Sequence, residues 1–190
     1  MASNRFSMGA RGFGDVRPRG DALRGMRDRL QPALLDRLTD EAPQRRSDTP
    51  GQGLMTHAEL RRAVLRDLRW LLNTVNLESA RDLEFLGHIQ ASTLNFGVRA
   101  MAGKRMSEID WSDLENTILD AIMLFEPRIL PETLAVTCET DTEALAHHNI
   151  VSLRIKGMLW CVPYPQEFLF RTDIDLETGH MDLADMGGWA

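Results

Sequence analysis

Cysteine and long apolar runs are both scarce in this sequence, and each shortage excludes a class of protein. The 190 residues hold two cysteines, Cys138 and Cys161, which form neither a disulfide framework nor a metal-ligand spacing. No stretch of about 18 apolar residues occurs, so we expect no segment to span a bilayer. The first residues are basic but lack the apolar run of a secretory signal. A reduced, cytoplasmic protein fits these absences.

Strong positive charge is also missing, which argues against nucleic acid as a partner. Residues 1–50 hold 10 Lys+Arg and 7 Asp+Glu, whereas residues 51–190 hold 12 and 21, so a mildly basic segment precedes an acidic body. The arginines of the first segment are spread among acids and glycines. This spacing predicts a solvated, flexible arm, although such arms can also dock onto acidic partners.

Composition and breaker residues predict four parts. Residues 1–29 are rich in Gly, Arg and Pro and are predicted to be a disordered basic arm. Residues 30–39 have the apolar spacing of one short amphipathic helix, and residues 40–55 are a polar linker. Residues 56–186 form the folded domain. The short helix is either tucked onto that domain or offered to a partner, and the sequence leaves both open.

The first half of the domain has the periodicity of helices. Thr56 and Glu59 form a capping box in front of a helix that runs to about Leu72. A second helix is predicted over residues 79–90. A third is predicted to run to Phe125, where Pro127 ends it. We therefore expect three main N-terminal helices.

After Pro131 the apolar period changes to two, which predicts short antiparallel strands. The stretches that alternate are residues 134–138, 151–159 and 168–175, and a hairpin turn at residues 177–179 leads into residues 180–183. Helices followed by strands predict an α+β fold, with the helices packed on a small antiparallel C-terminal sheet. The last strand pair is expected to leave an edge open, where a partner could add a strand.

The run Phe125-Glu126-Pro127-Arg128 places an acid and a guanidinium at the end of the third helix. Proline has no N–H and keeps the preceding residue out of helical geometry, so both charges sit at a sharp exit. They either neutralise each other as a surface ion pair or form a fixed corner that faces a partner.

A catalytic site does not assemble from the residues. Glu115 and Glu126 could be imagined as the acid and nucleophile of a glycosidase, but eleven helical residues separate them by about 16 Å. His147 and His148 are adjacent and lack further ligands at metal-binding spacing. We expect a protein that is not an enzyme and that uses no cofactor and no metal.

Several motifs, taken in order, resemble the TssE family, the baseplate subunits of type VI secretion systems that are related to the wedge protein of contractile phage tails. The motifs are Leu34-Leu35-Asp36-Arg37-Leu38, Val64-Leu-Arg-Asp67-Leu68, Leu71-Leu72-Asn73-Thr74, Ser92-Thr93-Leu94-Asn95-Phe96-Gly97, Phe125-Glu126-Pro127-Arg128, Leu159-Trp160 and Ile174-Asp175-Leu-Glu-Thr178-Gly179. The resemblance spans about residues 30–183. Two departures stand out: Val75 replaces a common arginine, and residues 98–101 replace Leu-Pro-Asp-Leu.

This resemblance implies a structural, non-catalytic role in a cytoplasmic baseplate that is docked at the inner membrane. The implied partners are the wedge proteins TssF and TssG, the sheath proteins TssB and TssC, and in addition TssK, with neither nucleic acid binding nor membrane insertion. Partner-binding residues are implied in three groups: Glu126, Pro127 and Arg128 as wedge anchors, Leu94, Asn95 and Phe96, and Ile174, Asp175 and Gly179. Residues 150–183 would template the first sheath ring by strand exchange. An older label for the family, lysozyme-related, implies a peptidoglycan hydrolase as the alternative.

Overall fold

Two amphipathic helices and one sheet make up most of the computed structural model, which describes residues 32–39, 43–44, 55–103, 109–139 and 150–187. The first long helix, α3 (His57–Leu72), begins at the capping box expected from the sequence. The Thr56 hydroxyl accepts from the Glu59 N–H, and the Glu59 carboxylate accepts from the Thr56 N–H. Its buried residues Leu60, Val64, Leu68 and Leu71 recur at helical spacing.

The second long helix, α5 (Trp111–Phe125), is capped by Asp110, whose carboxylate accepts from the N–H groups of Ser112 and Asp113. It ends at Phe125, as predicted from Pro127. Its buried side is formed by Leu114, Ile118, Ala121 and Ile122.

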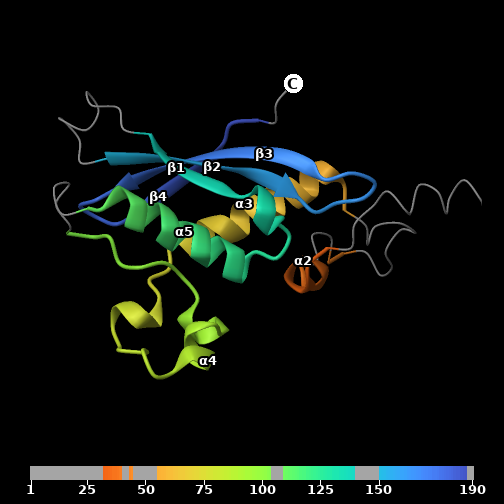
Figure 1. Ribbon diagram of the computed structural model, residues 1–190. Helices are drawn as coiled ribbons and strands as arrows, with labels where there is room; N and C mark the ends of the chain where they lie inside the picture. Colours follow the sequence, from red (N-terminus) through yellow and green to blue (C-terminus); the bar gives the residue numbers. More distant parts are fainter. Residues whose placement is uncertain (1–31, 40–42, 45–54, 104–108, 140–149, 188–190) are drawn as a thin grey trace, which may run out of the picture.

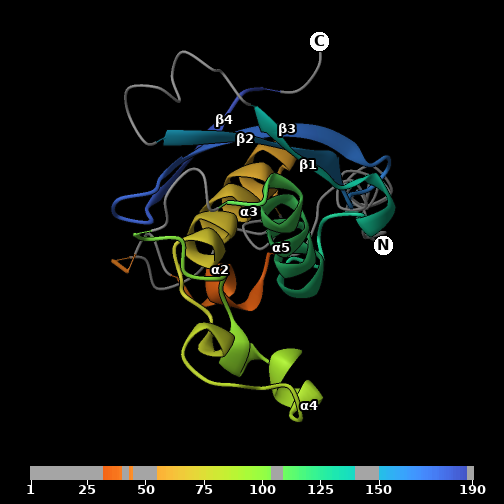
Figure 2. The same cartoon turned by 60° about the vertical axis from the view of Figure 1, so that its left-hand side comes forward.

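Four antiparallel strands follow in chain order β1-β2-β3-β4, which confirms the predicted α+β fold with an antiparallel sheet. Their bounds are β1 (Ala135–Glu139), β2 (Ile150–Leu159), β3 (Gln166–Asp175) and β4 (Met181–Asp185). Both long helices cover one face of this sheet (Figures 1 and 2). Phe168, Phe170 and Leu153 point into that layer and are fully buried. The opposite face carries exposed charged residues such as Arg154, Lys156 and Arg171.

Two side chains at the C-terminal end of α3, those of Arg69 and its capping residue Asn73, form hydrogen bonds with backbone groups on the outer edge of β4. The Asn73 side chain donates to the Met181 carbonyl (2.8 Å) and accepts from the Met181 N–H (3.0 Å), as a neighbouring strand would. Arg69 donates two hydrogen bonds to the Leu183 carbonyl, at 3.0 and 2.6 Å. The edge that the sequence led us to expect open is therefore covered along Met181–Leu183.

Replacing Asn73 by alanine should weaken the attachment of α3 to β4. Two hydrogen bonds to main-chain groups are lost, so we expect the free energy of unfolding to fall by about 1–2 kcal/mol. Urea denaturation measures this. An exposed control, Asp182→Ala on β4, should change stability by less than about 0.5 kcal/mol. Equal effects of the two substitutions would contradict the role given to Asn73.

The predicted helix over residues 79–90 is wrong. The chain instead forms a short 3₁₀ turn, η1 (Leu77–Ser79), an irregular stretch, the four-residue α4 (Gly87–Gln90) and a second turn, η2 (Thr93–Asn95). Local side chains compete with helical bonding: Asn76 accepts from the Ser79 N–H, and Asp82 accepts from the Glu84 N–H. The three main N-terminal helices therefore reduce to two long ones, and α5 lies directly before the strands.

Residues 76–97 form a lobe that hangs below the two helices on the side away from the sheet (Figures 1 and 2). Its neck is a parallel bridge between Val75 and Val98: the Val98 N–H donates to the Thr74 carbonyl (2.8 Å) and the Asn76 N–H to the Val98 carbonyl (3.0 Å). Gly97 closes the neck with φ +128°. Among the apolar side chains of the lobe, all of which the structure describes, Leu83 alone is buried.

The short helix α2 (Leu34–Leu38) lies under the two long helices. Most of the predicted arm and linker, residues 1–31, 40–42 and 45–54, lies outside the described part of the chain.

Candidate functional site

The Glu126-Pro127-Arg128 corner folds back on itself at the end of α5. Both carboxylate oxygens of Glu126 accept from the Arg128 guanidinium, Oε1 from Nε at 2.6 Å and Oε2 from Nη2 at 2.5 Å. Glu126 Oε1 also accepts from the Arg128 backbone N–H at 3.2 Å. The Glu126 side chain is buried, whereas Pro127 is exposed at the tip. The bidentate pair thus fixes the corner and leaves the proline outside.

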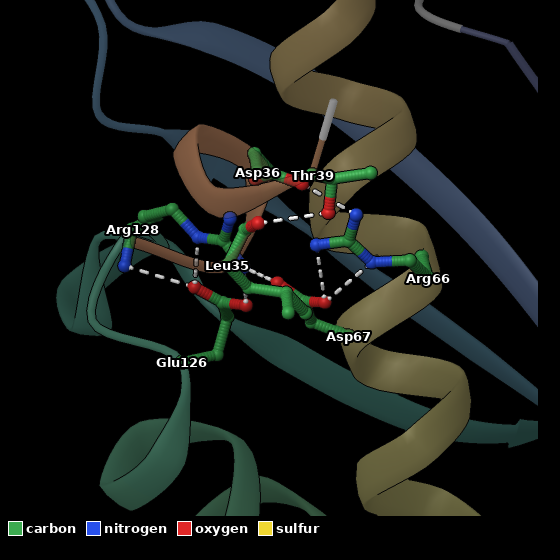
Figure 3. Close-up of polar contacts among 7 residues, drawn as sticks. All are labelled: Leu35, Asp36, Thr39, Arg66, Asp67, Glu126 and Arg128. Atoms are coloured by element: carbon green, nitrogen blue, oxygen red, sulfur yellow. Dashed lines mark hydrogen bonds and ion pairs between the residues drawn. The ribbon is translucent and has the colours of Figure 1, made fainter. Parts of the chain in front are cut away.

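The pair continues into an alternating chain of charges that joins three helices (Figure 3). Arg128 Nη2 also bonds to Asp67 Oδ2 of α3 at 2.5 Å. Asp67 Oδ1 accepts from Arg66 Nε at 2.8 Å, and Arg66 Nη1 reaches Asp36 Oδ1 of α2 at 2.5 Å. We call Asp36, Arg66, Asp67, Glu126 and Arg128 the charge ladder. It ties α2 and α3 to the end of α5.

The ladder keeps its two arginines charged. Burial lowers the pKa of Arg128, but the hydrogen bonds and negative charges of Glu126 and Asp67 outweigh this, so its pKa is raised. The hydrogen bond to Asp36 raises the pKa of Arg66, with Asp67 adding to it. Both cations are therefore fixed charges at every ordinary pH, and the geometry of the corner does not depend on their titration.

The corner also presents apolar surface. Leu34 and Leu38 of α2 are 69% and 74% exposed, so this helix is attached through Asp36 while its leucines face outward. Arg66 lies over the Trp70 ring, 5.0 Å from its centroid, and that ring is half exposed. Arg128 Nη1 is buried and, among the described residues, has no hydrogen-bond partner, so it is not available at the surface. Fixed charges beside exposed leucines and a proline make a surface suited to binding another protein.

The second group of sequence-predicted residues builds the lobe. Asn95 is buried; its side chain accepts from the Glu78 N–H at 2.9 Å and donates to the Gln90 carbonyl at 3.1 Å. Phe96 packs edge-on against Phe125, with ring centroids 5.3 Å apart. Leu94 differs from both because it is 71% exposed. Within this group, Leu94 is therefore the side chain that lies at the surface, and Phe96 joins the lobe to the end of α5.

The third group shapes the β3–β4 hairpin and lies apart from the corner. Ile174 is fully buried in the core. The Asp175 carboxylate accepts from the Glu177 N–H (2.8 Å) and the Thr178 hydroxyl (2.8 Å), and the first of these bonds is the main cause that lowers its pKa. Gly179 has φ +75°, as the turn requires.

The two carboxylates considered for a hydrolase are engaged in structural bonds. Glu126 holds Arg128, and Glu115 accepts from the Cys138 N–H of β1 at 2.6 Å. Within the described ranges, no three His, Cys, Asp or Glu side chains gather as a metal site would require. His147 and His148 lie outside those ranges. Of the helices the structure describes, none is long and apolar enough to cross a bilayer.

Cys138 should be an unreactive thiol. Burial, followed by the charge of Glu115, raises the pKa of Cys138 from its usual 9.0 to about 12. The folded thiol therefore keeps its proton where the unfolded thiol has lost it, so this contribution to stability is complete below pH 9 and is lost as the pH rises towards 12. We expect iodoacetamide at pH 8 to label Cys138 far faster in denaturant than in buffer, as mass spectrometry would show. Equal rates would contradict this environment.

Sequence reasoning missed the members of the ladder that come from other helices: Asp36, Arg66 and Asp67. A signal was present, because Asp67 and Asp36 both lie in motifs that resemble the TssE family. The ion pairs could not be predicted from the sequence, because 61 positions separate Arg128 from Asp67 and 30 separate Arg66 from Asp36.

Residues 58–164, more than half of the chain, match the family model of the baseplate wedge protein gp25. The matched segment begins one residue inside α3, contains the rest of that helix, α5, the lobe and the Glu126-Pro127-Arg128 corner, and ends before β3. Searches of curated proteins and of solved structures return no match. The chain belongs to the gp25 family of baseplate wedge proteins.

Proposed function

We propose that this chain is a TssE-type baseplate subunit of a type VI secretion system, which joins the baseplate wedge and nucleates the contractile sheath. The family supports a structural role in the baseplate of a contractile injection system. The observation that carries the finer proposal is the corner itself, where Pro127 and the α2 leucines are exposed beside charges fixed by the ladder.

The corner binds the wedge proteins TssF and TssG in this proposal. Pro127 and the partly exposed side chain of Arg128 make the contact, and Glu126 acts as a positioning residue because both its oxygens hold Arg128. The exposed leucines of α2 add apolar area next to them. Leu94, carried on the lobe by Asn95 and Phe96, extends the same contact.

The sheet binds the sheath proteins TssB and TssC through residues 150–183. Ile174, Asp175 and Gly179 serve this contact by shaping the β3–β4 hairpin. TssK is a further candidate partner in the same assembly. The role is non-catalytic and cytoplasmic, in a baseplate docked at the inner membrane.

Capture from the bacterium that encodes the chain tests this function. A tagged full-length chain should recover TssF, TssG and the sheath proteins. Leu34→Asp with Leu38→Asp, which alters exposed side chains, should lose TssF and TssG at least about tenfold, because burying an unpaired charge is costly. Lys156→Glu, on the exposed sheet face, should retain them. Recovery of none of these proteins by the wild-type chain would contradict the function.

A muramidase gains no support from Glu115 and Glu126, which are bonded at opposite ends of α5. We expect the purified chain to leave cell wall intact. Turnover that disappears in Glu115→Gln or Glu126→Gln would overturn the non-catalytic role.

A further inference from the structure

Helix α2 is attached to the rest of the protein mainly by one ion pair. Arg66 Nη1 of α3 bonds to Asp36 Oδ1 at 2.5 Å (Figure 3). Among the described residues, this is the one hydrogen bond or ion pair that joins α2 to another element. None of the α2 side chains is buried, and none belongs to the apolar core. Removal of this ion pair would therefore leave α2 without a strong attachment to α3.

Helix α2 is also too short to persist by itself. It has five residues, and its N-cap, Ala33, makes no side-chain hydrogen bond. The N–H groups of Arg37 and of the C-cap Thr39 bond to the carbonyls of Ala33 and Leu35. So few bonds do not offset the entropy lost when the backbone is ordered. The helix should therefore form only while it is attached to α3.

Detachment of α2 would not leave a charge stranded in the interior. Arg66 would keep its second bond, to Asp67 at 2.8 Å, and its position over the Trp70 ring. Asp36 Oδ2 is buried without a hydrogen-bond partner among the described residues, and detachment would return it to water. An uncompensated charge is what makes the loss of a buried ion pair costly. Both the attached and the detached state are therefore accessible to the folded protein.

The apolar residues of α2 contribute little to its attachment until another protein covers them. Leu34, Leu35 and Leu38 are all exposed in the attached helix. A partner that contacts Pro127 meets these leucines only while Asp36 holds α2 beside the charge ladder. Burial of the leucines by that partner would stabilise the attached state alone, and binding would shift the balance towards it.

We propose that α2 is a clasp that exchanges between an attached and a detached state in the free protein, and that binding of TssF–TssG closes it. The Asp36–Arg66 bond sets the balance between the two states, so Asp36 is a positioning residue for the leucines of α2. This inference rests on the proposed function and adds a segment that becomes ordered when the wedge proteins bind.

Amide hydrogen exchange of the full-length chain tests the clasp. In the free protein, the amides of residues 37–39 should exchange at least about tenfold faster than those in the middle of α3. Asp36→Asn should remove the remaining protection of α2 and leave α3 unchanged. Asp113→Asn is the matched control, because it removes the same charge from an exposed pair with Arg99 (2.8 Å) and should leave α2 unchanged. An excess of TssF–TssG should slow exchange in α2 at least about tenfold.

Three other results would overturn the clasp and leave the proposed function standing. The α2 amides could exchange as slowly as those of α3 in the free chain, which would make α2 a fixed part of the fold. Asp36→Asn could leave the protection of α2 unchanged, which would show that the ion pair does not hold it. TssF–TssG could bind without slowing exchange in α2. Failure of TssF–TssG to bind the wild-type chain at all would instead overturn the proposed function and the inference with it.

The affinity for TssF–TssG provides a second test. Asp36→Asn should bind at least about threefold more weakly than the wild type at low salt, because binding must then also close the clasp. At about 1 M salt, screening weakens the ion pair in the wild type, so the two affinities should converge. A ratio that stays the same at both salt concentrations would mean that Asp36 touches the partner directly. Equal affinities at low salt would show that Asp36 does not position α2.

Discussion

Glu126→Ala should lower the free energy of unfolding by about 3 kcal/mol. The substitution removes a buried carboxylate that accepts three hydrogen bonds from Arg128, and it leaves the guanidinium with Asp67 alone. We take the low end of the range for broken buried pairs because the Arg128 side chain is about one-fifth exposed and Asp67 remains. Urea denaturation would measure this loss as a lower midpoint concentration, with the dependence of the free energy of unfolding on urea concentration unchanged.

A matched control separates this effect from the general removal of an acid near the corner. Glu132 is exposed in the 3₁₀ turn η4 (Pro131–Thr133), and Glu132→Ala should cost less than about 0.5 kcal/mol. A cost for Glu126→Ala no larger than that of Glu132→Ala would show that the ladder does not stabilise the fold.

Replacing both Glu126 and Arg128 by apolar residues should lower the free energy of unfolding less than replacing Glu126 alone. An apolar pair of similar volume is often as stable as a buried ion pair, so Glu126→Met with Arg128→Met should recover most of the stability lost by Glu126→Ala. Asp67 keeps Arg66 as its partner in this double variant. The double variant therefore supplies a folded protein without the charges of the corner.

Gly97→Ala should open the neck of the lobe, at a cost of about 2–3 kcal/mol. An alanine Cβ would lie 2.3 Å from the Thr74 carbonyl oxygen, and φ at this residue is +128°. Both problems involve main-chain atoms of the Val75–Val98 bridge, so a rotamer change cannot relieve them. We expect faster amide hydrogen exchange over residues 76–98, with the sheet and α3 unaffected.

Gly87→Ala is the control for this substitution. Its Cβ would meet nothing within 4 Å, and Gly87 lies in α4, where alanine favours helix. This variant should match or slightly exceed the wild type in stability. Exchange that rises throughout the domain in Gly97→Ala would show that the lobe does not open as a separate unit.

Features encoded by neighbouring residues could be predicted from the sequence. The capping box at Thr56 and the helix end before Pro127 depend on residues within a few positions of each other, and the strands follow from alternation. The prediction of one helix over residues 79–90 is wrong, and the reason is also local. Asn76 and Asp82 bond to nearby backbone groups, which interrupts the helix despite its apolar spacing.

Contacts between distant residues could not be predicted in the same way. Glu126 and Arg128 were recognised as a corner, but Asp67 joins them only once α3 packs beside α5. Asn73 reaches Met181 across 108 residues, and this contact decides that the β4 edge is covered. Periodicity places such side chains on a face of a helix but does not say which main-chain group they meet.

The most direct measurement of the central claim is the affinity of the folded double variant, Glu126→Met with Arg128→Met, for the TssF–TssG complex. If the corner is a wedge contact, this variant should bind at least about tenfold more weakly than the wild type, while Glu132→Ala binds normally. Wild-type affinity in a double variant that is folded would mean that Glu126 and Arg128 only clamp the helices together, and would contradict the account.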